Sequence, residues 1–193
     1  MGSVTATRRL RLERIARSVR AIASGPALAL VLGAACGGPA ARTRDVPAAD
    51  EWLPFSGSWT ASGTRTALDL EAAHWAAILH MNGSLVLAGE KRPGVGFRAE
   101  VVGFTDSLTG LVGRSVWTDE RGDKVFSELK GVWVGAGNHV TGTFLGGTGR
   151  FVGATGEYEF QWHYLHTGED GAVAGRTTGL KGRVRLAAGA PVP

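Results

Sequence analysis

Apolar and polar residues alternate along most of the chain beyond Trp52, and glycine-rich or charged clusters interrupt the alternation at short intervals. A period of two places successive side chains on opposite faces of a strand, whereas an amphipathic helix needs apolar residues three and four apart. Only residues 67–77 offer a candidate helix, and they run directly into strand-like sequence. The pattern predicts eight strands, over residues 57–66, 74–88, 96–105, 111–118, 125–134, 140–145, 156–166 and 172–186.

The predicted strands are joined by short polar or glycine-containing segments. Short connections favour antiparallel neighbours, so the strands form a meander. A meander without covering helices leaves two exposed edges unless the sheet closes on itself. We therefore expect an all-β fold over residues 52–187, an eight-stranded antiparallel up-and-down barrel followed by a tail at 188–193. A two-sheet β-sandwich is the alternative.

A glycine motif occupies residues 146–156, with the sequence Gly-Gly-Thr-Gly-Arg-Phe-Val-Gly-Ala-Thr-Gly. Phosphate-binding glycine loops open a helix, but predicted strands flank this motif on both sides, which argues against phosphate binding. We expect a bulged corner between two strands, with Phe151 in the core. The glycines to which we assign this structural role are Gly146, Gly147, Gly149, Gly153 and Gly156.

Together with residues 157–160, the motif resembles the penultimate-strand motif of allene oxide cyclase-like proteins, and dirigent proteins share a related Gly-Gly-Thr-Gly-x-Phe. The resemblance implies an eight-stranded antiparallel barrel of calycin type. Allene oxide cyclases cyclise a fatty-acid epoxide, dirigent proteins steer the coupling of phenol radicals, and some bacterial relatives cyclise polyketides. The glycines shape a corner rather than perform chemistry, so the motif indicates fold and carries over no catalytic residue.

Aromatic residues alternate with polar ones on the strand at 156–166, so one face of that strand is aromatic. We expect this face to point into the barrel, where it either fills the core or lines an apolar pocket with Tyr hydroxyls and Trp N–H groups as polar handles. The candidate ligand-binding residues are Trp75, Met81, Phe97, Trp117, Tyr158, Phe160, Trp162 and Tyr164.

Glu100 and Glu128 are the candidate catalytic residues, because a carboxylate buried in the lumen would gain the raised pKa that a general acid or base needs. The alternative is that both point outward and pair with Arg98, Arg114 or Lys130. The five histidines show no spacing typical of a zinc site, and no Gly-x-Ser-x-Gly motif is present. The sequence therefore predicts no metal and no cofactor.

The N-terminus carries six arginines, then an uncharged run over residues 21–35, then Cys36, the only cysteine. This order is typical of a secretory signal, and the cysteine after small residues resembles the lipobox of bacterial lipoproteins. The resemblance implies that residues 1–35 are removed and that Cys36 is acylated, with residues 36–51 as a linker. Gly33 stands where the lipobox usually has Leu. The alternative is a plain signal and a secreted or periplasmic protein.

The formal charge of +4 belongs to the predicted signal, which holds six Arg and one Glu, so the remainder is close to neutral. A near-neutral domain gives no electrostatic case for nucleic acid. We therefore expect a lipid-anchored envelope barrel, on the cell or outer membrane, that binds a small apolar ligand or a protein partner. The alternative is a cofactor-independent cyclase or isomerase acting in the lumen on a lipid-like or polyketide substrate. A lumen filled by side chains favours neither the luminal ligand nor the cyclase.

Overall fold

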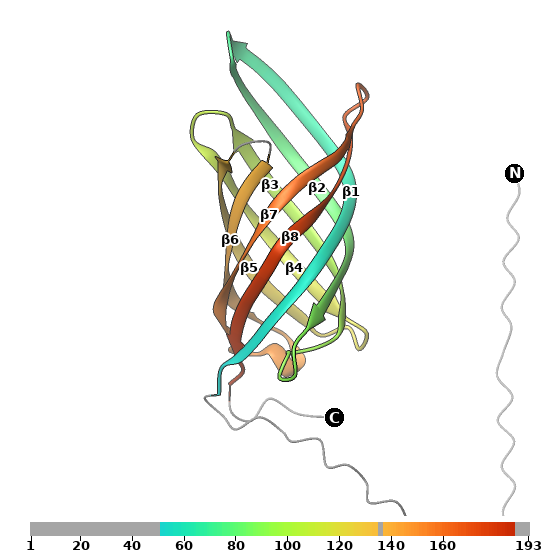
Figure 1. Ribbon diagram of the computed structural model, residues 1–193, viewed down its shortest axis with the longest axis vertical. Coiled ribbons are helices and arrows are strands. Elements are labelled where there is room, and N and C mark those ends of the chain that lie inside the picture. Colours follow the sequence, from blue (N-terminus) through green and yellow to red (C-terminus); the bar gives the residue numbers. More distant parts are fainter. Residues whose placement is uncertain (1–50, 135–136, 188–193) are drawn as a thin grey trace, which may run out of the picture. The chain divides into compact units, whose positions relative to one another are not determined.

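The computed structural model describes residues 51–134 and 137–187, and all eight predicted strands are present (Figure 1). Cys36, the predicted signal at 1–35, nearly all of the predicted linker and the tail at 188–193 lie outside the described residues. The elements are β1 (Leu53–Glu71), β2 (His74–Ala88), β3 (Gly96–Asp106), β4 (Gly110–Asp119), β5 (Lys124–Val134), β6 (Gly137–Gly147), the 3₁₀ turn η1 (Gly149–Phe151), β7 (Thr155–Thr167) and β8 (Ala172–Arg185).

The strands form one closed barrel in which each strand pairs with its sequence neighbours and β1 pairs with β8. Every pairing is antiparallel, so the predicted up-and-down barrel is confirmed and the sandwich alternative is wrong. Closure pairs both edges of the sheet and leaves no open backbone row. The buried core cluster lies entirely between Leu53 and Val184, so residues 51–187 have the closed sheet and the core of a self-contained folding unit.

The two ends of the barrel differ in what they carry (Figure 1). The end that we call the terminal end holds the start of β1, the end of β8, and the β2–β3, β4–β5 and β6–β7 connections. The opposite end, called the far end, holds the other four hairpin connections, and the β1–β2 hairpin projects furthest there. No helix in the part of the chain that the structure describes is long and apolar enough to cross a membrane.

Residues 67–77, the candidate helix, form strand and turn instead. Strand β1 continues to Glu71, Ala73 turns the chain with φ of 62°, and β2 begins at His74. Leu68 pairs with Ala76 across this hairpin, so backbone pairing overrides the helix propensity of an alanine-rich segment. Strand β6 likewise begins at Gly137, before the predicted start at 140, because Asn138 pairs with both Trp133 and Trp162.

The glycine motif closes the terminal end. Gly149 has φ of 53°, and a Cβ atom there would lie 1.8 Å from an Asp123 carboxylate oxygen, so a larger residue would be strained and would displace Asp123. Arg150 forms an ion pair of 2.7 Å with Asp119, the last residue of β4 before the β4–β5 turn. Phe151 is 1% exposed, and its ring lies 5.9 Å from that of Phe97. The motif therefore docks the β6–β7 corner on a neighbouring turn and seals the core.

Candidate functional site

The candidate ligand-binding residues lie on the inner surface of the barrel, but most of them pack against one another. The ring of Trp117 lies 4.7 Å from that of Tyr158 and 5.3 Å from that of Phe144. Six of the eight candidates are buried, and Trp75 and Tyr164, nearer the far end, are partly buried. The buried six are Met81, Phe97, Trp117, Tyr158, Phe160 and Trp162.

The cavities that the described residues leave in the lumen are small. One of about 10 Å³ lies beside Ser115 and Tyr158, and one of about 40 Å³ is lined by Met81, Trp162 and Tyr164 among others. A single water needs roughly 10–15 Å³, and pockets for drug-sized ligands measure about 300–1,000 Å³. Side chains therefore fill most of the lumen.

Three hydroxyl groups form a closed ring in the lumen. The Ser127 Oγ atom lies 2.7 Å from the Tyr158 hydroxyl and 2.6 Å from the Ser115 Oγ atom, which in turn lies 3.1 Å from the Tyr158 hydroxyl. Burial raises the pKa of Tyr158 to about 12, so the phenol stays protonated at neutral pH. Sequence reasoning missed both serines, although each occupies an inward position of the alternating pattern.

Within residues 51–134 and 137–187, the buried indole nitrogens of Trp59 and Trp162 find no hydrogen-bond acceptor, and both rings line the larger cavity. The two ring centroids are 5.0 Å apart. Trp59 lies on β1 and was not among the candidate residues. Its inward position in the alternating pattern could have identified it. The cavity therefore has aromatic walls, but it is too small for a lipid-like molecule.

Glu100 and Glu128 lie on the outer surface and not in the lumen. The Glu100 carboxylate bonds Arg98 at 3.1 Å, and Glu128 bridges Arg114 at 3.3 Å and Lys130 at 3.2 Å. Among the described residues, no carboxylate lines either cavity. The same part of the chain holds no group of three or more His, Cys, Asp or Glu residues arranged to bind a metal.

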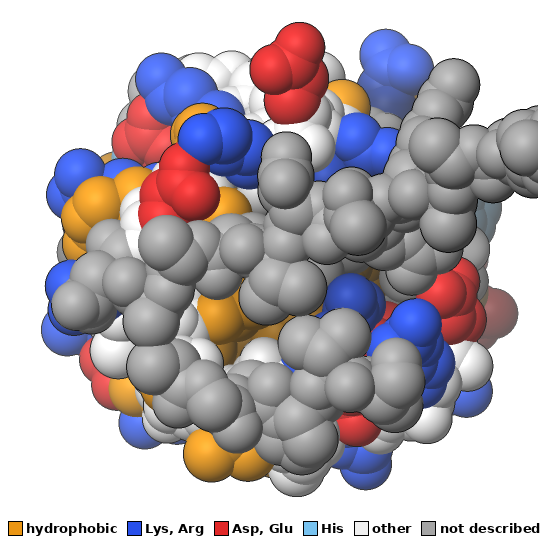
Figure 2. All heavy atoms as spheres, turned by 90° about the horizontal axis from the view of Figure 1, so that it is seen from below, with side chains coloured by type: hydrophobic (Ala, Val, Ile, Leu, Met, Phe, Trp, Pro, Cys, Tyr) orange, Lys and Arg blue, Asp and Glu red, His pale blue; other side chains and the backbone are white. Residues whose placement is uncertain are grey.

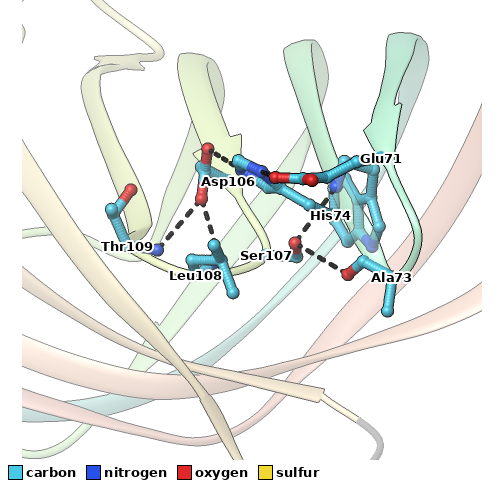
Figure 3. Close-up of polar contacts among 8 residues, drawn as sticks. Glu71, Ala73, His74, Asp106, Ser107, Leu108 and Thr109 are labelled. Atoms are coloured by element: carbon cyan, nitrogen blue, oxygen red, sulfur yellow. Dashed lines mark hydrogen bonds and ion pairs between the residues drawn. The ribbon is translucent and has the colours of Figure 1, made fainter.

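A polar cluster at the far end joins the first two hairpins there (Figure 3). The Asp106 Oδ1 atom accepts hydrogen bonds from the backbone N–H groups of Leu108 at 2.8 Å and Thr109 at 3.0 Å. Its Oδ2 atom lies 3.0 Å from the His74 Nε2 atom. The hydrogen bond from His74 is the largest cause, and those from the backbone the next, of an Asp106 pKa lowered to about 2.

This His–Asp pair joins two hairpins, and the described part of the chain places no free nucleophile beside it. The nearby Ser107 Oγ atom accepts a hydrogen bond from the Trp75 backbone N–H at 3.1 Å and donates one to the Ala73 carbonyl at 3.3 Å. Both oxygens of Asp106 are also engaged, which favours a structural role for the cluster. Sequence reasoning missed this cluster, because only the register between β2 and β3 brings Asp106 close to His74.

The outer surface carries an unexpected apolar face. Ile78 on β2 lies directly opposite Phe104 on β3, which lies directly opposite Val112 on β4. These side chains are 60%, 46% and 55% exposed. Leu68 on β1 and Val102 on β3 are also exposed. Each lies two residues along its strand from this row, on the same outer face. We call these five residues the apolar face.

The outer surface of β6 to β8 is polar by contrast. Thr141 and Thr143 point outward on β6, and Glu159 on β7 bonds Lys181 on β8 at 3.0 Å. The hydrogen bond from Lys181 is the largest cause of the lowered pKa of Glu159. On these strands the exposed large apolar residues are Leu145, near the terminal end, and Leu165, near the far end. The contiguous apolar row is thus confined to one side of the barrel.

Comparison with known proteins adds no relative. No protein-family model, no curated protein and no solved structure matches this chain. The resemblance of the glycine motif to that of calycin-type barrels therefore stands on the motif residues alone.

Proposed function

We propose that this chain is an exported, lipid-anchored barrel of the cell envelope that binds a protein partner through the apolar face. One observation supports the binding role above all others. Three large apolar side chains (Ile78, Phe104 and Val112) form a row on the outer surface of a barrel whose lumen is almost filled.

The lumen offers little support for a ligand-carrying role or for an enzyme. A cavity of about 40 Å³ has no room for a lipid-like or polyketide substrate. A cyclase that relies on one luminal carboxylate would need Glu100 or Glu128 inside, and both form ion pairs outside. The outer surface is therefore a stronger candidate than the lumen for the functional site.

The apolar face has the composition of an interface core. Exposed contiguous apolar patches on soluble domains mark sites of interaction, whereas single exposed apolar residues need no explanation. Phe104 is central to the face, and aromatic residues are enriched in the cores of protein interfaces. His80 and Arg114, the partners of Val102 on the neighbouring strands, supply a polar rim. A rigid β-surface of this kind suits a partner that presents an apolar strand or sheet face.

The anchor rests on the N-terminal resemblance, with Cys36 as the acylated residue. The linker from 36 to 51 would hold the barrel at the membrane surface, and Gly37 rather than Asp after the cysteine would allow sorting to an outer membrane. The calycin-type resemblance of the glycine motif fits the same picture, because it concerns the barrel and not the anchor.

The anchor is tested by Cys36→Ser in the native host with a clickable palmitate analogue. We expect the variant to lose the label and to shift from the membrane fraction to the soluble fraction, because acyl chains supply most of the membrane affinity. A variant that keeps wild-type label and remains in the membrane fraction would overturn the anchor.

The binding role is tested by Phe104→Asp, with Thr141→Asp as the matched control on the polar side of the barrel. In detergent extracts of the envelope, we expect wild-type protein and the control to elute as part of a larger complex and Phe104→Asp to elute alone. Equal elution of all three proteins would remove the apolar face from the proposal.

A further inference from the structure

We propose that the terminal end of the barrel lies on an anionic lipid surface, with Trp52 as its interfacial side chain. This inference rests on the proposed membrane tether but concerns a different surface from the apolar face. The supporting observations are an exposed indole in contact with two arginines, two exposed valines at the same end, and a charge difference between the two ends of the barrel.

Trp52 precedes β1, and its ring contacts two arginines from the end of β8. Its ring centroid lies 4.7 Å from the Arg183 Cζ atom and 5.2 Å from the Arg185 Cζ atom, yet the residue is 40% exposed. Tryptophan is enriched at membrane–water interfaces because an apolar ring carries one polar N–H group. The Arg183 guanidinium also pairs with the Glu157 carboxylate at 2.7 Å, and guanidinium groups are equally suited to bonding lipid phosphates.

Further apolar side chains lie at the same end. Val95 belongs to the β2–β3 connection and Val152 to the β6–β7 corner, and both are exposed. The two valines and Trp52 therefore come from three separate segments of the terminal end. Figure 2, which views this end, shows basic side chains around the rim with hydrophobic and acidic ones between them. An end with this mixture can insert apolar side chains shallowly while its cations meet headgroups.

Charge is distributed unequally between the two ends. Within the described residues, the far end carries Asp69, Glu71, Asp106, Glu169 and Asp170 against Arg65. The terminal end carries Lys91, Arg92, Arg121, Lys124, Arg150, Arg183 and Arg185 against Glu51, Glu90, Asp119, Glu120, Asp123 and Glu157. These residues give a formal net charge of +1 at the terminal end and −4 at the far end, so an anionic surface repels the far end and favours an approach by the terminal end.

The position of Cys36 brings the same end to the membrane. Cys36 lies sixteen positions before Trp52, so the chain between them spans at most about 55 Å, and it enters the barrel at the terminal end. An anchor so close in sequence gives this end a high effective concentration at the bilayer. A weak contact through Trp52 therefore suffices to orient the barrel, with the far end and its acidic residues directed away from the lipid.

The test uses the isolated barrel, residues 51–187, whose sheet is closed and whose core is complete. Flotation with phosphatidylcholine vesicles, with and without phosphatidylglycerol, measures its partition onto lipid. We expect partition onto the anionic vesicles only. Arg185→Gln is expected to lower that partition about five-fold, the equivalent of about 1 kcal/mol for one basic residue. Arg176→Gln, on the same strand but away from the terminal end, is the control and is expected to change nothing.

Brominated lipids give a second measurement, in which the wild-type barrel is compared with Trp52→Phe. We expect them to quench part of the wild-type tryptophan fluorescence on anionic vesicles and to quench none in Trp52→Phe. No partition, equal partition onto neutral vesicles, or equal quenching in both proteins would overturn the inference. Because this barrel lacks Cys36, the result is independent of the acylation test. A barrel that binds lipid while Cys36 carries no acyl chain would refute the tether alone.

Discussion

Phe104 on β3 lies directly opposite Ile78 on β2, and both side chains point away from the barrel axis. An exposed cross-strand pair contributes roughly 0.2–1 kcal/mol to a sheet. We therefore expect Phe104→Thr to lower the free energy of unfolding by less than about 1 kcal/mol. Phe160→Ala, in the lumen, is expected to cost about 3–5 kcal/mol. Urea denaturation of the two variants makes the comparison, and a cost for Phe104→Thr as large as that of Phe160→Ala would show a structural role instead.

The hydroxyl ring in the lumen predicts a moderate effect of Tyr158→Phe. The variant removes one hydroxyl, but Ser115 and Ser127 remain bonded to each other at 2.6 Å. We expect a loss of about 1–2 kcal/mol in the free energy of unfolding, since two hydrogen bonds disappear and one remains. Urea denaturation with an unchanged m-value measures it. An unchanged midpoint would show that the ring contributes nothing to stability.

Tyr158 also predicts a loss of stability in alkali. Its pKa is raised in the folded barrel to about 12 from the ordinary tyrosine value of 10.0, so folding favours the protonated phenol. Its contribution is fully present below pH 10 and is lost as the pH rises towards 12, to a total of about 3 kcal/mol. Burial raises the pKa of Tyr164 as well, so its effect has the same sign. Denaturation curves from pH 8 upward should fall less steeply for Tyr158→Phe than for the wild type.

Asp106 predicts the opposite behaviour in acid. Its pKa is lowered to about 2, so the carboxylate contributes stability above pH 3.8 that is lost as the pH falls towards 2. Asp106→Ala removes the acceptor for the Leu108 and Thr109 amides. We expect faster hydrogen exchange at these two amides in the alanine variant and partial protection in Asp106→Asn, which keeps one side-chain oxygen. Unchanged exchange in Asp106→Ala would contradict the role of this cluster in joining the hairpins.

The strand pattern was predictable because period-two alternation persists through all eight strands. Residues 67–77 were not, because alanine-rich sequence carries a local helix preference and only pairing with β2 decides the outcome. The inward direction of Tyr158 and Trp162 also follows from alternation. That these rings fill the lumen does not, because it depends on contacts between strands far apart in sequence, such as Trp117 on β4 with Tyr158 on β7.

The apolar face lay beyond sequence reasoning for a related reason. Ile78, Phe104 and Val112 are ordinary outward residues of three separate strands. Only the register of β2, β3 and β4 brings them into one row. Glu100 and Glu128 show the reverse case, because the sequence already offers the cations that hold them outside. Arg98 and Lys130 lie two positions away on the same strands, and only Arg114 comes from a neighbouring strand.

The glycine motif predicts a sharp difference between two glycines. Gly149→Ala places a Cβ atom 1.8 Å from an Asp123 oxygen at a positive φ of 53°, so both strain and a clash result. We expect a loss of more than about 2 kcal/mol in the free energy of unfolding. Gly96→Ala is the control, because no atom lies within 4 Å of the added Cβ there. Thermal denaturation of the two variants decides the point, and equal midpoints would contradict the docking of this corner.

The most direct test of the central claim is site-specific photocrosslinking in the native envelope. A photoreactive residue at position 112 replaces an apolar residue of the apolar face, and one at position 143 replaces Thr143 on the polar side. We predict one discrete protein adduct from position 112, its loss when Phe104→Asp is added, and no adduct from position 143. No adduct from position 112, or the same adduct from both positions, would contradict partner binding through the apolar face.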